Sequence, residues 1–298
     1  MPTRPTIVLI LVGWVVAAAG LFHRDILPEF RNTPPPDLRS VAGANDDATP
    51  TTWFLSVADD AGLKSLRPVG RAYTRTEHRP DGTTVLISNV SFDSNGMLRG
   101  TPFAPRVEES GPEGHVTIHN SCEVDPSGNL RQFRVKVYST ADTSAPLLTI
   151  DARNAGRTIE ATVRGPYPWL NRPVSIPYEP RGLVQNGIGP VDRLPGLQVG
   201  QRWRTEVVNP MTGIPGTALT EVTGKHSIFW NNTSVSTLEV LQKLSPGAGM
   251  PEVAARTWVR PDGLVLRQEV PLPFVRLILE RAPATVAGGP ANLGSQAP

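Results

Sequence analysis

Short turn sequences built from Pro, Asp or Asn, and Gly are the feature that most constrains the fold of this chain. "RPDG" occurs at 79–82 and again at 260–263, and "DSNG" (93–96), "DPSG" (125–128) and "NPMTG" (209–213) are chemically similar. Pro presets φ inside a turn, Asp or Asn bonds the nearby backbone, and Gly accepts a positive φ. Because each turn lies between strand-like segments, we expect β-hairpins and consecutive antiparallel strands.

The segments between these turns alternate apolar and polar residues. The alternation is clearest in 130–138, 157–163 and 264–270. A period of two with β-branched residues is typical of a strand with one buried face. Weaker alternation predicts further strands at 83–92, 115–124, 202–208, 217–224, 226–231 and 234–244. Residues 53–66 are the one helical candidate here, because Trp53, Val57 and Leu63 loosely follow a period of 3.6.

Pro and Gly number 31 and 27 among 298 residues, which exceeds their usual combined share of ~12% and favours turns over long helices. They are densest at 164–200. We therefore predict a mainly β domain over 53–282, a curved antiparallel sheet or incomplete β-barrel. We favour one continuous sheet whose two halves meet at 164–200, and the alternative is two lobes separated by that break.

Residues 6–22 contain no charged side chain and follow Arg4. A membrane-spanning helix needs ~20 apolar residues, with a range of ~17–25. Residues 1–30 therefore predict one transmembrane helix acting as a signal anchor, with a cytoplasmic N-terminus and an exported body. The alternative is a secreted protein, released by cleavage near Ala19, because residues 17–19 are all Ala.

Segments of low hydrophobicity flank the predicted β domain. Residues 31–52 contain three consecutive prolines, 34–36, and predict a spacer between membrane and domain. Residues 283–298 have a similar composition and predict a disordered tail.

The charge balance and the single cysteine exclude several classes of site. A net charge of +2 from 29 basic and 27 acidic residues gives no sign of a nucleic-acid-binding stripe. With only Cys122, neither an intramolecular disulfide nor a cysteine-rich zinc site can form. On a strand, His115 and His119 have Cα atoms ~13 Å apart, at ~3.3 Å per residue, which is too far for one zinc ion.

No catalytic or nucleotide-binding motif is present. The chain contains no G-x-S-x-G, P-loop or G-x-G-x-x-G sequence. In a regular strand Cys122 faces away from His115 and His119, so a Cys–His dyad would require an irregular strand. Asp262 is interpreted as a turn residue, and Arg267 with Glu269 as one solvated strand face. We therefore expect no enzyme activity, no cofactor and no metal.

Aromatic residues suggest binding instead. A curved sheet with a long apolar face can surround a lipid-like ligand, and aromatic side chains bury large areas there. The candidate lining residues are Phe133, Trp169, Trp203, Trp230, Trp258 and Phe274. The alternative is that these aromatics fill an ordinary core.

The second half resembles a known family. "LPGLQVGQRWRTEVVNPMTG" (194–213), "LTEVTGKHSIFWNNTSVSTLEVLQ" (219–242) and "ARTWVRPDGLVLRQEVPLPFVRLILER" (255–281) resemble exported LolA-like β-rich domains. There a "VG..W" strand, a "V.G.E.I" hairpin and a "W...DG..LR.E" hairpin recur, although "VTGKHSI" lacks the Glu. The resemblance implies an incomplete antiparallel barrel that holds an apolar partner, and it brings no catalytic residues. The carrier activity is not carried over, because a carrier must diffuse freely.

We therefore predict a membrane-anchored, exported β-domain protein that binds an apolar ligand or serves as a scaffold in the cell envelope. Its expected partners are the membrane, through residues 6–22, and a lipid-like ligand or an envelope protein. Two alternatives remain: an envelope hydrolase with unidentified catalytic residues, and an accessory subunit of a membrane complex that pairs through its sheet edges.

Overall fold

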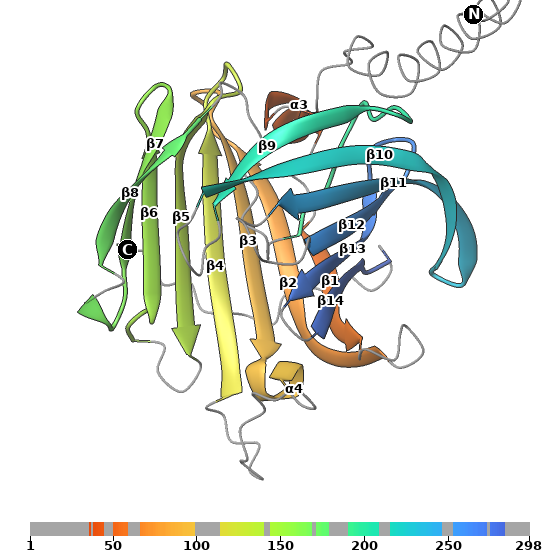
Figure 1. The fold of residues 1–298 in the computed structure, drawn as a ribbon, viewed down its shortest axis with the longest axis horizontal. Coiled ribbons are helices and arrows are strands. Elements are labelled where there is room, and N and C mark those ends of the chain that lie inside the picture. Colours follow the sequence, from red (N-terminus) through yellow and green to blue (C-terminus); the bar gives the residue numbers. More distant parts are fainter. Residues whose placement is uncertain are drawn as a thin grey trace, which may run out of the picture.

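The computed structural model describes residues 36, 38–44, 50–58, 66–98, 114–139, 144–168, 171–178, 190–208, 215–245, 253–272 and 275–283. Fourteen strands in these residues form a single antiparallel sheet (Figure 1). The first half contains β1 (Thr51–Ala58), β2 (Leu66–His78), β3 (Thr84–Asp93), β4 (His115–Val124), β5 (Leu130–Ser139), β6 (Leu148–Asn154), β7 (Thr158–Arg164) and β8 (Arg172–Pro177). The second half contains β9 (Arg202–Val208), β10 (Pro215–Trp230), β11 (Thr233–Ser245), β12 (Val253–Val259), β13 (Val265–Leu272) and β14 (Val275–Arg281). Within the described residues, two short helices, α3 (Leu38–Ala44) and α4 (Ser94–Leu98), accompany the sheet.

The sheet consists of two meanders that join through the first and last strands. The strand order runs from β8 back to β1, continues to β14 and then runs back to β9. The junction pairs Trp53 with Arg281 and continues to Ala58 with Arg276. The expectation of a mainly β fold with one curved antiparallel sheet is confirmed, and the described sheet is open. The halves do not meet at 164–200, however, because that region leads from one end of the sheet, β8, to the other, β9.

Three of the predicted hairpin turns are confirmed. In each, a backbone N–H and C=O bond across the turn: Arg79 with Thr83, Asp125 with Asn129, and Arg260 with Leu264. Gly82, Gly128 and Gly263 have φ of +79°, +87° and +85°, which is the left-handed region that favours glycine. The turn Asp also accepts a hydrogen bond from the backbone N–H two residues later, as in Asp262 with Leu264 at 3.2 Å.

Two local predictions are wrong. The "DSNG" sequence does not form a hairpin turn, because Ser94–Leu98 forms α4 after β3. The helical candidate 53–66 begins as strand β1 instead. The spacing of Trp53 and Val57 fits the helical period of 3.6 as well as the strand period of two. Leu55 between them is also fully buried, and burial of every second residue is the pattern of a strand. "NPMTG" lies outside the described residues.

Curvature gives the sheet a concave face that carries the core. The first core cluster contains residues from both meanders: Val41, Trp53, Leu55, Val57, Val69, Ala72, Val90, Leu194, Val222, Leu238, Val240, Val259, Val265, Val275, Leu277 and Leu279. Register shifts, such as the one between Leu55 and Ser56 and the one between Val222 and Gly224, increase the local twist and bend the strands. In Figure 1, β9–β14 therefore run across the first half of the sheet at a steep angle.

In the part of the chain that the structure describes, no helix has the length and hydrophobicity needed to cross a membrane. Residues 6–22, on which the predicted anchor rests, lie outside that part, as do residues 284–298 of the predicted tail.

Candidate functional site

The concave face changes character along the sheet. The first core cluster joins β1–β3 to β10–β14. The second contains Val124, Leu130, Ile150, Ala152, Ile159, Ala161 and Tyr178, and within the described residues it includes no side chain from β9–β14. We call these two regions the closed end and the open end of the concave face.

The open end is apolar but incompletely covered. Cross-strand pairing places Cys122, Phe133, Ala152, Ala161 and Val174 in one row on this face. The neighbouring row contains Val135, Ile150 and Val163. Ile150 and the two alanines are buried, whereas several apolar side chains beside them are only half-buried: Phe133, Val135, Leu148, Val163 and Val174. The open end therefore presents an apolar surface that the described strands of the second half do not cover.

The closed end is covered by a segment that leads into β9. Val191, Leu194 and Leu197 of this segment pack against the first core cluster. Its backbone bonds the β12–β13 turn: the Leu194 N–H donates to the Gly263 carbonyl at 2.8 Å. The Val191 N–H donates to Gln268 Oε1 at 2.9 Å. Residues 190–197 therefore form a covering segment held over the concave face.

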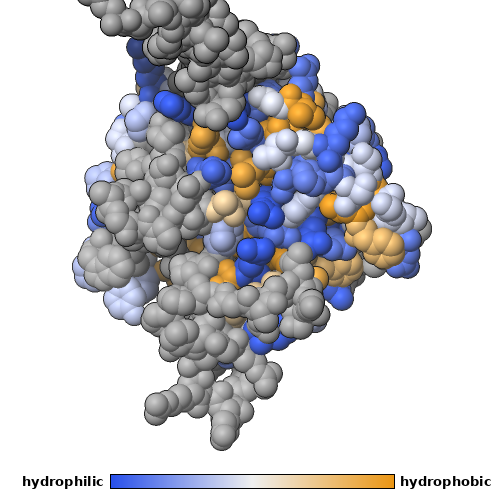
Figure 2. Space-filling model, turned by 45° about the vertical axis from the view of Figure 1, so that its right-hand side comes forward, coloured by the Kyte–Doolittle hydropathy of each residue, from blue (hydrophilic) through white to orange (hydrophobic). Residues whose placement is uncertain are grey.

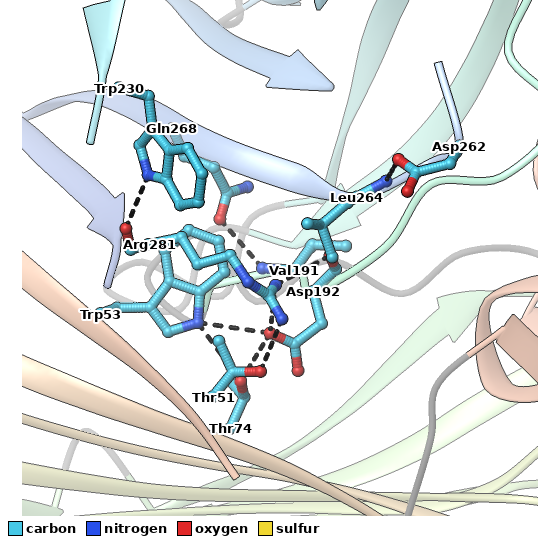
Figure 3. Close-up of polar contacts among 10 residues, drawn as sticks. All are labelled: Thr51, Trp53, Thr74, Val191, Asp192, Trp230, Asp262, Leu264, Gln268 and Arg281. Carbon is cyan, nitrogen blue, oxygen red and sulfur yellow. Dashed lines mark hydrogen bonds and ion pairs between the residues drawn. The ribbon is translucent and has the colours of Figure 1, made fainter. Parts of the chain in front are cut away.

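A buried polar network holds this covering segment to the sheet (Figure 3). Asp192 Oδ1 accepts hydrogen bonds from Thr74 Oγ1 at 2.6 Å and from Trp53 Nε1 at 3.3 Å. Arg281 lies 3.4 Å from the same oxygen, donates to Thr51 Oγ1 at 2.8 Å, and lies over the Trp53 ring at 5.6 Å. These contacts join β1, β2 and β14 to the covering segment.

Burial dominates the electrostatics of Asp192. It raises the pKa of Asp192, and the Thr74 hydrogen bond and the Arg281 charge oppose this rise only in part. Burial also lowers the pKa of Arg281, against the attraction of Asp192. Sequence reasoning missed Asp192, because it is a loop residue between Pro190 and Leu194 whose partners lie far away in the sequence. From the local sequence alone, Asp192 indicates only a turn.

The convex face of the second half is lined with charge pairs. Glu239 lies 3.2 Å from His226 and 3.8 Å from Arg256, and Arg202 bonds Glu221 at 2.7 Å. Figure 2 shows the side of the molecule that carries β10–β14, where hydrophilic residues predominate and hydrophobic ones form small separate patches.

Glu269 departs from the solvated strand face expected for it. It shares the convex face with Arg267, as predicted, but is only 3% exposed. It lies 3.1 Å from Arg267 and 3.5 Å from Arg276. A buried carboxylate is tolerable when cations pair with it. The pair Arg267 and Glu269 therefore belongs to a buried ion cluster, and the interpretation as ordinary solvated charge is wrong.

The structure separates the aromatic residues predicted to line a binding site. Phe133 lies on the open end, and Trp203 packs against the first core cluster. Trp230 donates its indole N–H to the Arg281 carbonyl at 2.8 Å. Trp258 pairs with Arg267, whose guanidinium lies 5.4 Å from the ring centroid, on the convex face. Trp169 and Phe274 lie outside the described residues. A ligand contact by any of the six remains a prediction.

Cys122 and the nearby histidines lie on opposite faces of β4. Cys122 belongs to the open end, where burial and the neighbouring Glu123 raise its pKa to about 12. The thiol is therefore protonated at neutral pH and a poor nucleophile. His119 faces the other way and contacts the Tyr138 ring edge-on at 5.3 Å. Burial and Lys136 lower the pKa of His119.

Comparisons with known proteins give structural neighbours only. No protein-family model and no curated protein matches the chain. A β-barrel-like protein of a domain of unknown function, DUF1849, from Brucella abortus has a TM-score of 0.48 at 10% identity, over 78% of this chain and 94% of its own. The hypothetical lipoprotein YmcC from Escherichia coli has a TM-score of 0.31 at 9% identity, over 78% and 86%. A putative lipoprotein from Parabacteroides distasonis has a TM-score of 0.31 at 10% identity, over 80% and 96%. The resemblance to LolA-like domains remains a prediction.

Proposed function

We propose that this chain is a cell-envelope binding protein that holds an apolar, lipid-like ligand against the open end of its concave face. The observation that carries the proposal is the contrast between the two ends of that face. At the closed end Trp53, Leu55 and Val57 are 0% exposed. At the open end Leu130 and Ile159 are also buried, but Val135 and Val163 occupy inward positions and are only half-buried.

Half-buried apolar surface of this extent favours a bound partner. Removing apolar surface from water contributes ~25 cal/mol per Å². A sheet normally obtains that gain by packing its apolar face against other elements of the same fold. From β4 to β8 the face spans five strands, which corresponds to ~19 Å at ~4.8 Å per strand. An extended hydrocarbon chain fits a surface of this shape and recovers the missing burial.

Other functions have weaker support in the geometry. Pairing of a partner strand with the β8 edge is hindered, because Pro173 and Pro177 remove two backbone N–H donors from it. Cys122 is an inert thiol on the face opposite His119, so these two residues do not form the catalytic dyad of a hydrolase. The anchor predicted at residues 6–22 places the binding face next to a membrane, which is a source of lipid.

A pair of substitutions on β7 tests the proposal. Val163 faces inward and is half-buried, whereas its neighbour Thr162 is exposed on the convex face. The measurement is native mass spectrometry of lipid co-purified with the full chain from envelope extract. Val163→Glu is expected to abolish co-purification, and Thr162→Glu to preserve it, with circular dichroism confirming that both variants fold. A wild-type chain free of lipid, or a Val163→Glu chain that retains it, would overturn the proposal.

A further inference from the structure

We infer that the ligand is amphipathic, with an uncharged, hydrogen-bonding head seated on Ser88 and Asn120 and a hydrocarbon tail lying across β5–β7. This inference rests on the proposed function and specifies the chemistry of its ligand. It starts from one row of residues that crosses the concave face from the closed end to the open end.

Strand register defines this row. Thr74 on β2 pairs with Ser88 on β3, and Ser88 pairs with Asn120 on β4. The row then continues with apolar residues: Val135, Ile150 and Val163. Successive pairs in an antiparallel sheet point their side chains to the same face. The concave face therefore carries a polar patch that leads directly into the apolar open end.

Ser88 is the unusual member of the row. It is 6% exposed, and its hydroxyl oxygen has no hydrogen-bond partner among the described residues. A buried polar group without a partner is costly and rare in native proteins. The adjacent Thr74 hydroxyl is already engaged, since it donates to Asp192 and accepts from the Trp53 indole. The Ser88 hydroxyl thus keeps an unused donor and acceptor, buried on the concave side of the sheet.

Asn120 adds a second polar group beside Ser88. It is half-buried, and strand register places it directly opposite Ser88. An amide and a hydroxyl each supply both donors and acceptors. A ligand head that carries hydroxyl or amide groups can therefore satisfy both side chains at once.

The charges near the row favour an uncharged head. Asp192 and Arg281, which lie beside Thr74, neutralise each other. From Thr74 to Val163 the row itself contains no ionisable side chain. A charged head placed at Ser88 would lose hydration without gaining a counter-ion, which is strongly unfavourable. The geometry therefore fits an acyl chain that ends in a hydroxyl-bearing group, such as a monoacylglycerol.

The test compares probes that share one tail, titrated calorimetrically into the full chain. Monododecanoylglycerol carries free hydroxyls, methyl dodecanoate has the same tail without them, and dodecanoate carries a charge. Ser88→Ala is expected to weaken monododecanoylglycerol binding about tenfold, the effect of one buried hydrogen bond, and to leave methyl dodecanoate unchanged. Ser91→Ala is the matched control, because Ser91 lies on the same strand but faces Thr117 on the convex side.

The outcomes separate this inference from the proposed function. Failure of the wild-type chain to bind any of the three probes overturns both. Binding of monododecanoylglycerol that is unaffected by Ser88→Ala overturns only the placement of the head. A preference for dodecanoate overturns the uncharged head and favours the reverse orientation, in which the carboxylate lies near Arg172 at the β8 end of the row.

Discussion

The contact between the β12–β13 turn and the covering segment predicts a large effect of the substitution Gly263→Ala. Gly263 has a φ of +85°, where a side chain is unfavourable. A Cβ atom at this position would also lie 2.8 Å from the Pro195 Cα atom and 3.2 Å from the Leu194 carbonyl carbon. Both neighbours are backbone atoms of the covering segment, so they cannot move away from the new Cβ atom unless the whole segment shifts.

The expected cost has two parts. A non-glycine residue in the left-handed region costs ~1–2 kcal/mol. Overpacking a well-fitted site adds ~1–3 kcal/mol. Gly156 isolates the first part, because it has a φ of +92° and nothing lies within 4 Å of its Cβ position. Gly263→Ala is therefore expected to lower the free energy of unfolding by ~2–5 kcal/mol, and Gly156→Ala by ~1–2 kcal/mol.

Urea denaturation of the full chain, followed by circular dichroism, measures both variants against the wild type. The difference between them reports the contact of the turn with the covering segment. Equal losses of stability for the two variants would show that the covering segment is not packed closely against Gly263, and would refute the proposed packing of the closed end.

Further predictions concern the buried network, His119 and Ser88. Arg281→Met leaves Asp192 buried without its cation and is expected to cost ~3–5 kcal/mol in urea denaturation, whereas adding Asp192→Asn should restore part of the loss. Because the folded pKa of Asp192 is raised above its ordinary 3.8, its contribution to stability is present below that pH and is lost as the pH rises through the folded value. Asp192→Asn should remove this dependence from a series of unfolding curves. The pKa of His119 is lowered from 6.5, so stability should fall as the pH drops below 6.5, and His119→Gln should flatten that fall. Ser88→Ala removes an unpartnered buried hydroxyl and should raise the stability of the ligand-free chain by ~1 kcal/mol, measured by the same denaturation, and an unchanged midpoint would contradict that account.

Local chemistry explains which parts of the fold were predictable. The turns at 79–82, 125–128 and 260–263 depend on residues within four positions of one another, and all three form as expected. Strand β4 matches its predicted range for the same reason, since alternation is a local property. The helical prediction for the first strand is wrong because the spacing of Trp53 and Val57 fits a helix as well as a strand, and only the burial of Leu55 distinguishes the two.

The candidate site depends on contacts that the sequence does not reveal. Asp192 meets Thr74 and Trp53 across separations of 118 and 139 residues, and no local pattern marks any of the three as a partner. Ser88 belongs to an ordinary alternating strand, and its missing hydrogen bond becomes visible only once strand register places it between Thr74 and Asn120. The predicted aromatic lining used residue type alone, which does not distinguish the concave position of Phe133 from the convex position of Trp258.

The way in which the second meander packs across only the first three strands of the first meander explains why one concave face has a closed and an open end. The first meander supplies eight strands and the second six, and they join through β1 and β14. When the curved sheet folds across itself, the second meander shares a core with β1–β3, and the surplus strands of the first meander extend beyond it (Figure 1). Those surplus strands keep the period-two pattern of a buried face, since on β7 the inward Ile159, Ala161 and Val163 alternate with the exposed Glu160 and Thr162. An apolar face without opposing strands exposes apolar surface to water, which is unfavourable unless a bound partner covers it. A ligand at the open end provides that burial. Ser88 and Asn120 lie where the two ends meet, and there they can form hydrogen bonds with the polar group of the ligand.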